Sequence, residues 1–345
     1  MTLKEVGIDF KRIPLPEYVV EIEPDTFTPE IKKGNPKSLI HDIKEVKTHK
    51  HPFRKTLGDE FESYVKRHAG TKMNIVVDKS SDLLWLDYKE HGDLVEEISI
   101  YAEPYTKATI VFDYHNEAST VHHGLTKIVV DEGAELNIIK IQNNSLKGQF
   151  IDHTKSEIYD RATLNVIDVQ MGSENMIINY DANLLGYQAH CDYKSIYLAA
   201  DKRGLDLSFT VNHVGKKSTS DILGKGVLGG ESKKVFRGTL HFERGAVQSA
   251  GKEEEFVLLL SDKVKADSIP ALMCTEDDVI GEHGASIGQL DENRLFYLMS
   301  RGLSEMEAKL MVIQSNFREI IENIEDEDVR QWSLQSIDRS IEHVV

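Results

Sequence analysis

The sequence predicts a mainly β protein whose core is a parallel β-helix. From about Met73 the chain consists of short runs rich in β-branched and aromatic residues, such as ATIVFDY and LDLSFTVNHV. Gly, Asn, Asp or charged turns separate these runs and no helical pattern lies between them, which favours an all-β fold over alternating strands and helices. A β-sandwich also satisfies these observations. We favour the β-helix because VDEGAELNI (130–138) and FERGAVQSA (242–250) repeat a tight glycine turn between two strands.

Proline placement separates the start of the chain from its middle. Six of the eight prolines lie within the first 52 residues, and none lies between Pro104 and Pro270. Because proline interrupts helices and sheet ladders, we expect an irregular start and a continuously hydrogen-bonded middle. Apolar residues at helical spacing predict one helix over about 57–68. We therefore expect three parts: a Pro-rich and helical segment (1–70), a β-helix core (71–288) and a C-terminal helical domain (289–345).

The C-terminal part shows helical periodicity. Asp291 is expected to cap a helix that runs through Arg301, with Gly302 in the left-handed conformation that ends it. Ser304 and Glu307 form a capping box that opens a second helix. Its apolar stripe recurs at steps of four and three residues, at Met306, Leu310, Ile313, Phe317, Ile320 and Ile324. A third helix is expected over about 327–344, carrying Trp332, Ile337 and Ile341.

Composition excludes several classes of partner and compartment. The 345 residues include 41 Lys+Arg and 58 Asp+Glu, a net charge of −17 that repels nucleic acid and anionic lipid. We therefore expect neither nucleic acid nor a membrane as a partner. The two cysteines, Cys191 and Cys274, are far apart and form no C-x-x-C motif, which indicates a reducing compartment. The N-terminus carries no apolar stretch of signal-peptide length, so a cytoplasmic location is expected.

Motifs for common catalytic chemistry are missing. The sequence contains no G-x-x-x-x-G-K-[ST], no G-x-S-x-G and no H-E-x-x-H, which argues against a P-loop ATPase, a serine hydrolase and a zincin. The acidic run Glu253–Glu255 is interpreted as solvated charge leading into a buried strand. Histidines in strand-like runs, namely His122, His123, His213 and His241, are interpreted as surface or hydrogen-bonded core residues.

His283 differs from the other histidines in its surroundings. Asp277, Asp278 and Glu282 place three carboxylates within six residues of its imidazole. The neighbours Gly281 and Gly284 leave the backbone free to approach a ligand or partner closely. These groups could build a metal-cluster site or an acid/base site, and a charged turn is the alternative.

Six ordered motifs carry a resemblance to a known family. The stretch from about Ser220 to Ala308 resembles the C-terminal region of the SufB/SufD family of the SUF system, which are scaffold proteins for iron-sulfur cluster assembly. The motifs are KGVL (225–228), VFRGTL (235–240), LLLS (258–261), ADSIP (266–270), DDVIGEHGAS (277–286) and LFYLMSRGLS (295–304). Upstream the similarity is one of strand pattern only.

The resemblance implies a fold and a set of partners. It implies a right-handed parallel β-helix flanked by helical segments, paired through the β-helix with a SufB-like paralogue or with a second copy. It also implies that the C-terminal helices dock the ATPase SufC, so that ATP hydrolysis occurs in the partner and this chain is a non-catalytic scaffold. The implied SufC-docking residues are Arg301, Gly302, Met306, Leu310, Ile313 and Phe317.

The resemblance further implies a transient iron-sulfur cluster shared with the partner. His283 matches the family histidine implied as a cluster and metal ligand, and Glu282 is a weaker candidate. Glu255 stands where SufB-like sequences carry a cysteine, and HGAS is similar to the SufD form, so the SufD-like subtype is favoured. SufD-like sequences often have a cysteine where this chain has Gly281. Cys274 matches no motif position and is expected to be a core cysteine.

Two other functions remain open at this stage. One is a polysaccharide-active β-helix enzyme, which would need clustered carboxylates beside basic residues and is usually exported. The other is a purely structural β-helix that docks SufC without contacting a cluster. The sequence does not distinguish a homodimer from a heterodimer, and it shows no flavin motif. Residues 291–345 hold 12 acidic against 6 basic residues, which suggests that SufC presents a basic or mixed face to the acidic stretch Glu325–Asp328.

Overall fold

The computed structural model describes residues 22, 24–34, 59–80, 83–89 and 91–341. Its strands are β1 (Glu30–Lys33), β2 (Thr71–Val77), β3 (Leu84–Lys89), β4 (Leu94–Ala102), β5 (Lys107–His115), β6 (Thr120–Val130), β7 (Glu135–Gln142), β8 (Gly148–Ile158), β9 (Thr163–Gln170), β10 (Asn175–Leu184), β11 (His190–Ala199), β12 (Gly204–His213), β13 (Thr219–Leu228), β14 (Lys233–Phe242), β15 (Ser249–Leu259), β16 (Lys265–Ser268), β17 (Ala271–Cys274) and β18 (Val279–Gln289). Its helices are α1 (Asp59–His68), α2 (Glu292–Ser300), α3 (Glu305–Ile321) and α4 (Glu327–Ile341).

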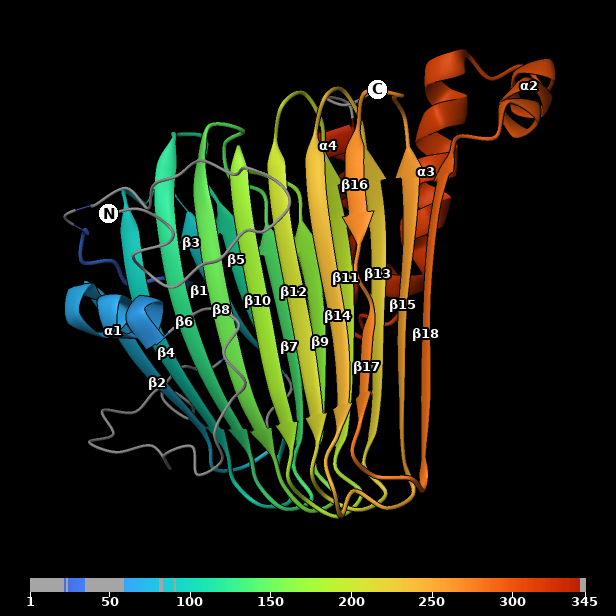
Figure 1. The fold of residues 1–345 in the computed structure, drawn as a ribbon. Coiled ribbons are helices and arrows are strands. Elements are labelled where there is room, and N and C mark those ends of the chain that lie inside the picture. The colour runs from blue at the N-terminus through green and yellow to red at the C-terminus, as the bar shows by residue number, and fades with distance from the viewer. Residues whose placement is uncertain (1–21, 23, 35–58, 81–82, 90, 342–345) are drawn as a thin grey trace.

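The strands form two sheets through which the chain winds alternately (Figure 1). One sheet has the order β1-β3-β5-β7-β9-β11-β13-β15-β18, and is called the odd sheet here. The other, the even sheet, has the order β16-β14-β12-β10-β8-β6-β4-β2, with β17 also paired to β14. All pairs are parallel except β1 with β3. Register partners in the parallel pairs lie between 25 residues (Thr71 and Glu96) and 32 residues (Lys233 and Lys265) apart. This arrangement is the predicted parallel β-helix.

Side chains point inward at every second position of each strand, and they fill the space between the two sheets. In β5, Ile110, Phe112 and Tyr114 join the interior core, whereas Val111 joins a separate apolar cluster on the outer face. Because adjacent coils are in register, interior side chains of one coil stack on those of the next. The rings of the register partners Tyr88 and Tyr114, for example, lie 4.4 Å apart between centroids. The interior is therefore a continuous column of packed side chains.

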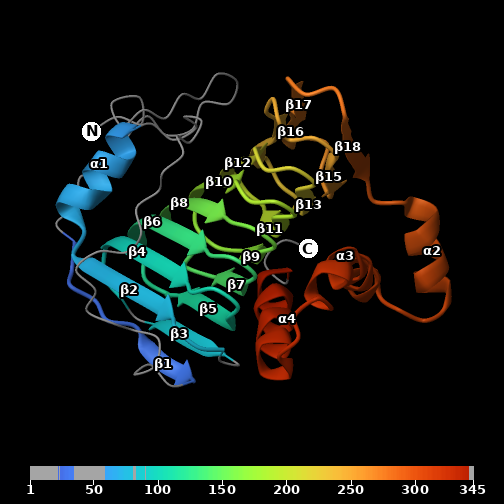
Figure 2. The same ribbon diagram turned by 90° about the horizontal axis from the view of Figure 1, so that it is seen from below.

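Helices lie on both outer faces of the β-helix, and α1 reaches only one end of the even sheet (Figure 2). Helices α3 and α4 lie against the odd sheet, where Ile313, Phe317 and Ile337 share one buried cluster with outward residues such as Ile167 and Ile196. Helix α1 packs its apolar side on the even sheet, against side chains that include Leu125 and Ile151. Parallel strands that are buried on both faces have nearly continuous apolar sequences, and the sequences of these strands follow that pattern.

The predicted helix boundaries are confirmed in detail. The Asp291 side chain accepts from the backbone N–H groups of the first turn of α2, and Gly302 has a φ of 103° after its end. Ser304 and Glu307 form the predicted capping box of α3. The third helix ends at Ile341 in the described residues, and the predicted residues 342–344 lie outside them. None of the described helices is both long enough and apolar enough to span a bilayer.

Two expectations about the beginning of the chain need comment. The predicted N-terminal helix is present as α1, with Phe61, Tyr64 and Val65 buried as its spacing indicated, while 57–58 lie outside the described residues. The proline-rich start is not wholly irregular, because β1 pairs antiparallel with β3 at the edge of the odd sheet. An edge position needs ladder hydrogen bonds on one side only, so prolines on either side of so short a strand are tolerated.

The four strand histidines that the sequence assigned to surface or hydrogen-bonded core are all buried. His213 has both ring nitrogens 2.8 Å from serine hydroxyls, those of Ser218 and Ser220. Burial lowers the pKa of His213 to about 3, so the folded protein keeps this imidazole neutral.

This burial predicts an acid-dependent loss of stability. In the unfolded chain His213 binds a proton below about pH 6.5, whereas the folded chain does not bind it until near pH 3. The free energy of unfolding therefore falls as pH falls from about 6.5, by up to about 1.4 kcal/mol per pH unit for this group. We expect His213→Gln, which can still bond to the serines, to lose less stability between about pH 7 and pH 4.5 than the parent protein, as measured by urea unfolding. Buried acids such as Glu96 contribute the same pH dependence to the parent and to the variant. An equal loss of unfolding free energy in both proteins would therefore contradict the prediction.

Candidate functional site at the C-terminal end of the β-helix

Strand β18 forms the terminal edge of the odd sheet. It pairs with β15 along its whole length, and no other described strand pairs with it. Large apolar side chains are exposed on the strands at this end, namely Phe256 (38%), Leu272 (37%), Met273 (46%), Ile280 (64%) and Ile287 (40%). An edge with free backbone groups beside exposed apolar side chains is a surface on which another strand can pair.

His283 lies on this edge strand, in register with Glu253 of β15. Because side chains alternate along a strand, His283 points to the same side of the odd sheet as the inward-facing Gly251, Glu253 and Glu255 of β15. No further coil covers His283, so its side chain is exposed. Its imidazole is therefore both accessible to a partner and close to the polar interior. Glu282, Asp277 and Asp278 are exposed as well.

The interpretation of Glu253–Glu255 as solvated charge was wrong. Glu253 and Glu255 are buried, with 1% and 0% exposure, and only Glu254 faces outward. The run is part of a strand, so alternate carboxylates enter the β-helix. Burial, followed by repulsion from the two neighbouring carboxylates, raises the pKa of Glu253 to about 7. Its Oε2 has no hydrogen-bond partner among the described residues.

Glu255 is held by a buried ion pair and two hydroxyl groups. Lys234 Nζ lies 2.6 Å from Glu255 Oε1, and both side chains are fully buried. Tyr197 and Ser268 donate hydrogen bonds from their hydroxyl groups to the two carboxylate oxygens. Burial lowers the pKa of Lys234, an effect that the charge of Glu255 opposes. A buried salt bridge thus holds the Glu255 carboxylate inside the β-helix.

Glycines in the motifs make room for these buried side chains. A Cβ on Gly226 of KGVL would lie 2.1 Å from the Tyr197 ring, and a Cβ on Gly238 of VFRGTL would lie 2.4 Å from Glu253. Both glycines lie in strands, so the reason for glycine at these positions is close approach by a side chain. Ser268 of ADSIP and His283 of DDVIGEHGAS reach the same end of the β-helix. The separate sequence motifs therefore converge on one region.

The two cysteines have different environments. Cys191 is buried in the interior, and burial raises the pKa of its thiol to about 12. Cys274 is exposed at the end of β17, so the expectation that it is a core cysteine was wrong. Its strand has only four residues and follows the last complete coil, so no further described strand covers it. Cys274 is thus the one cysteine that a partner can reach.

The residues implied in SufC docking fall into two groups. Arg301 and Met306 are exposed, and the Arg301 guanidinium lies 5.2 Å from the centroid of the Tyr297 ring. Gly302 is exposed too, and a Cβ added there would meet no described atom within 4 Å. Ile313 and Phe317, in contrast, are buried against the odd sheet, and Leu310 packs at the border of the same cluster. The free side of the helices thus includes only part of the predicted set.

Sequence reasoning missed the exposed apolar surface of α2. This helix has no buried residues, and it stands away from the β-helix (Figure 1). Phe296 is 74% exposed, Tyr297 55% and Met299 42%, and Met311 of α3 is 47% exposed. The available signal was the run of five apolar or aromatic residues, Leu295 to Met299, within ENRLFYLMS. Five consecutive residues surround a helix, so no single face could bury all of them on this chain.

Comparison with known proteins identifies the family. A protein-family model matches residues 86–316, which is more than half of the chain. The family is described as "SUF system FeS cluster assembly, SufBD core domain". The chain belongs to the SufBD family. The match contains most of β3 and both sheets of the β-helix from β4 onward, and it extends into α3.

Individual SufBD relatives agree with this assignment. The iron-sulfur cluster assembly protein SufD of Bacillus subtilis is 26% identical over 274 residues, covering 78% of this chain and 62% of that protein. An iron-sulfur cluster assembly SufBD family protein of Mycobacterium leprae is 29% identical over 227 residues, covering 66% of this chain and 25% of that protein. A SufBD family protein of Staphylococcus aureus is 28% identical over 195 residues, covering 56% and 42%. The chain thus spans less than two thirds of each of these relatives.

For this SufBD protein, the buried ion pair leads to a stability prediction. We expect Lys234→Met to lower the free energy of unfolding by about 3–5 kcal/mol, because it leaves the Glu255 carboxylate buried without its counter-charge. The double variant Lys234→Met with Glu255→Gln removes both charges and should recover much of this loss, since the amide still bonds to Tyr197 and Ser268. Urea unfolding followed by circular dichroism measures both. A double variant no more stable than the single one would contradict the argument.

Proposed function

We propose that this chain is a SufD-like scaffold subunit of a complex that assembles iron-sulfur clusters. In this proposal it pairs through its β-helix with a SufB-like partner, or with a second copy, and its C-terminal helices dock a SufC-like ATPase. The chain itself catalyses no step. The observation that carries the proposal is the unpaired edge of β18, with exposed apolar side chains around it and His283 on its inward row.

Pairing would use the free edge of β18. A partner strand that adds to this edge satisfies the backbone groups that β15 does not reach, and it covers Ile280 and Ile287. The opposite end of the odd sheet does not offer the same surface, because the short antiparallel β1 covers β3 there. This difference between the two ends supports pairing at the C-terminal end of the β-helix.

Cluster contact would occur where the partner covers this edge. His283 would supply a neutral imidazole nitrogen as a ligand to the nascent cluster, which is the cargo of the complex, and Glu282 is the weaker candidate. Of the two cysteines, Cys191 is buried with a thiol pKa of about 12, and Cys274 offers one sulfur ligand. Since iron-sulfur clusters take several thiolate ligands, most of them would come from the partner.

Docking of SufC would use the exposed side of α2 and the start of α3. Phe296, Tyr297, Arg301 and Met306 lie there, whereas Ile313 and Phe317 would hold α3 on the odd sheet. Of the acidic stretch 325–328, Asp326 and Asp328 contact Lys33 of β1, and Glu327 pairs with Arg330. Glu325 is therefore the acidic residue of this stretch that is left for a basic partner. ATP-dependent dimerisation of SufC would pull on these helices and shift the pairing interface towards an open state.

Replacement of His283 tests the cluster role. Co-expression with SufB and SufC under anaerobic conditions, followed by iron and sulfide analysis of the purified complex, should show a severalfold lower cluster content for His283→Ala, because the imidazole ligand is lost. His190→Ala, which removes a histidine of the odd sheet far from β18, is the matched control and should retain the parent content. Unchanged cluster content in His283→Ala, with a complex of normal size, would reject the ligand role and leave a purely structural subunit.

Replacement of Phe296 tests SufC docking. Phe296→Asp puts a charge in the centre of the exposed apolar surface, so we expect the Kd for SufC to rise by at least about tenfold, a cost typical of a central aromatic residue. Isothermal titration calorimetry measures it. Tyr187→Asp, an equally simple change at an exposed aromatic residue on a distant turn, should bind SufC as the parent does. Equal Kd values for Phe296→Asp and the parent would exclude α2 from the docking surface.

A further inference from the structure

A second group of potential ligands lies on the outer face of the odd sheet, at the opposite end of the β-helix from β18. Asp87 of β3 is the register partner of Asp113 of β5, and His115 lies two residues beyond Asp113 on the same strand. The intervening Tyr88 and Tyr114 face the interior core, so these three side chains share the outer face. The pattern appears in the sequence as LDYK followed by FDYH, one coil apart.

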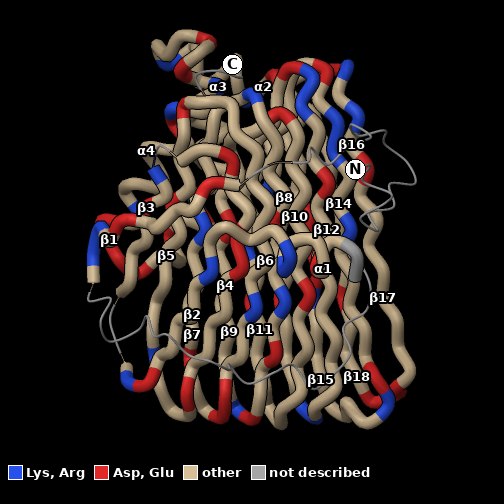
Figure 3. The backbone as a smooth tube through the Cα atoms, turned by 90° about the vertical axis from the view of Figure 1, so that its left-hand side faces the viewer, with Lys and Arg blue, Asp and Glu red and all other residues tan. Residues whose placement is uncertain are grey.

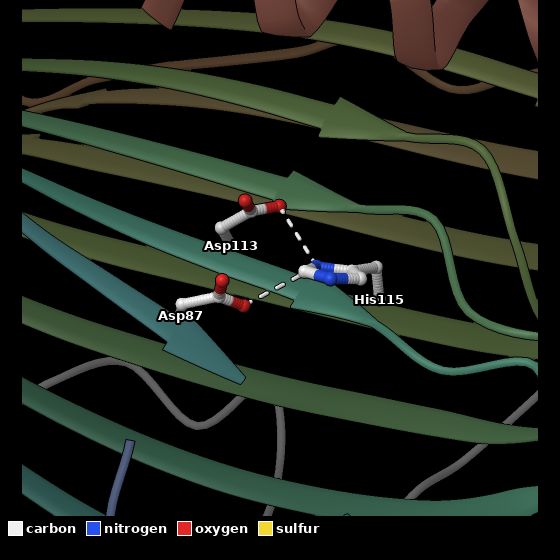
Figure 4. A group of neighbouring side chains, drawn as sticks. All are labelled: Asp87, Asp113 and His115. Atoms are coloured by element: carbon white, nitrogen blue, oxygen red, sulfur yellow. Dashed lines mark ion pairs between the residues drawn. The ribbon is translucent and has the colours of Figure 1, made fainter. Parts of the chain in front are cut away.

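The three side chains point towards one another (Figure 4). His115 Nδ1 lies 3.5 Å from Oδ1 of Asp87 and 3.5 Å from Oδ1 of Asp113. Each of these three atoms is buried and has no hydrogen-bond partner among the described residues. The Asp113 side chain is 1% exposed, that of Asp87 13% and that of His115 23%. Buried polar atoms normally have hydrogen-bond partners, so a cluster of three without one needs an explanation.

We propose that Asp87, Asp113 and His115 bind a divalent transition-metal ion. Among the described residues this is the group in which three such ligand atoms lie within 4.8 Å of one another. Bonds of about 2.0–2.2 Å place neighbouring ligand atoms about 3.0–3.5 Å apart around a tetrahedral or octahedral ion. The two imidazole–carboxylate distances are already in this range. Small rotations of the carboxylates would complete the geometry.

The chemistry of the ligand set selects the kind of ion. One imidazole with two carboxylates suits Zn²⁺ or Fe²⁺ better than Mg²⁺ or Ca²⁺, which prefer oxygen ligands alone. Three protein ligands leave at least one position for water. Burial also raises the pKa of Asp87, and a bound cation would favour its charged form.

Lys32 of β1 supplies the competing positive charge. Its Nζ lies 3.5 Å from Asp113 Oδ2, the oxygen that also accepts from Trp85 Nε1. The ammonium group is placed between two indole rings, 4.2 Å from the centroid of Trp85 and 3.8 Å from that of Trp332. Lys32 thus neutralises part of the carboxylate charge but leaves Oδ1 of Asp113 free. Its charge repels an incoming cation, so its removal should strengthen metal binding.

An ion can reach the cluster from solvent. His115 lines a cavity of about 580 Å³ between the loops at the end of β3, β5 and β7 and helix α4, which contributes Arg339 and Ser340. Most of the other lining side chains, among them Asn116 and Asn143, are polar. His115 therefore connects the cluster to solvent, whereas Asp87 and Asp113 do not line this cavity. An ion bound there would join two coils of the β-helix next to the C-terminal helices.

The two tryptophans of the chain allow a specific test, because both flank the cluster. The full chain, without an affinity tag and freed of metal with a chelator, is titrated with Co²⁺ while tryptophan fluorescence is recorded. We expect saturable quenching with one Co²⁺ per chain, and competition by Zn²⁺. His115→Ala and Asp113→Asn should each weaken binding by at least about tenfold. Lys32→Met should tighten it, an effect that a purely structural salt-bridge cluster would not produce.

Controls separate this site from the rest of the chain. His190→Ala, in the same sheet but outside the cluster, should bind Co²⁺ as the parent does. Circular dichroism establishes whether each variant is folded. If Asp113→Asn does not fold, Lys32→Met still tests the proposal, because it leaves all three ligands in place. Absence of saturable quenching, or parent-like affinity in both His115→Ala and Lys32→Met, would overturn the proposal. The titration needs neither SufB nor SufC, so its result is independent of the proposed role in cluster assembly.

Discussion

The structure depends on one constraint, the parallel register between successive coils. Each strand satisfies its backbone hydrogen bonds with the strands one coil before and one coil after it, so every interior position is placed directly over an equivalent one. Within the column, this stacking gives each strand hydrogen-bond partners on both sides. At the two ends of the column, the last strand lacks a partner on one side. The short antiparallel strand β1 covers one end of the odd sheet, whereas β18 leaves the other end open. The candidate pairing surface is therefore a direct consequence of where the coil stacking stops.

The same register explains why charged groups enter the interior near that end. Side chains at alternate positions of β15 face inward, so the acidic run places Glu253 and Glu255 inside the β-helix. Burial of a carboxylate is costly, and Lys234 compensates it for Glu255. Glu253 forms no such ion pair with any described residue, and its pKa is raised to about 7. The buried charges therefore lie next to the inward-facing side of β18, which contains His283.

On the side drawn in Figure 3, acidic and basic residues are interspersed along the strands and turns, so that side has no uniform charge.

The C-terminal helices divide two tasks between them. Helices α3 and α4 bury their apolar residues on the outer face of the odd sheet and so complete the fold. Helix α2 has no buried residues and carries its aromatic side chains into solvent. Such a helix gains little from its own chain, which is the arrangement expected of a segment that a partner covers. In the proposed complex, α2 would receive the force generated by the ATPase and α3 would transmit it to the β-helix.

The sequence alone determined the local structure and the family resemblance. Capping residues such as Asp291 and Ser304, and the stripe from Met306 to Ile324, act through neighbours a few positions away, so their effects can be read in one dimension. Repeated glycine turns indicated the β-helix for the same reason. Only the tertiary structure decided which face each residue occupies. It buried Glu255 beside Lys234, exposed Cys274, and brought Asp87 beside Asp113 and His115 across two coils. These outcomes depend on strand phase and on register between segments about 20 to 30 residues apart, where a shift of one residue moves every side chain to the opposite face.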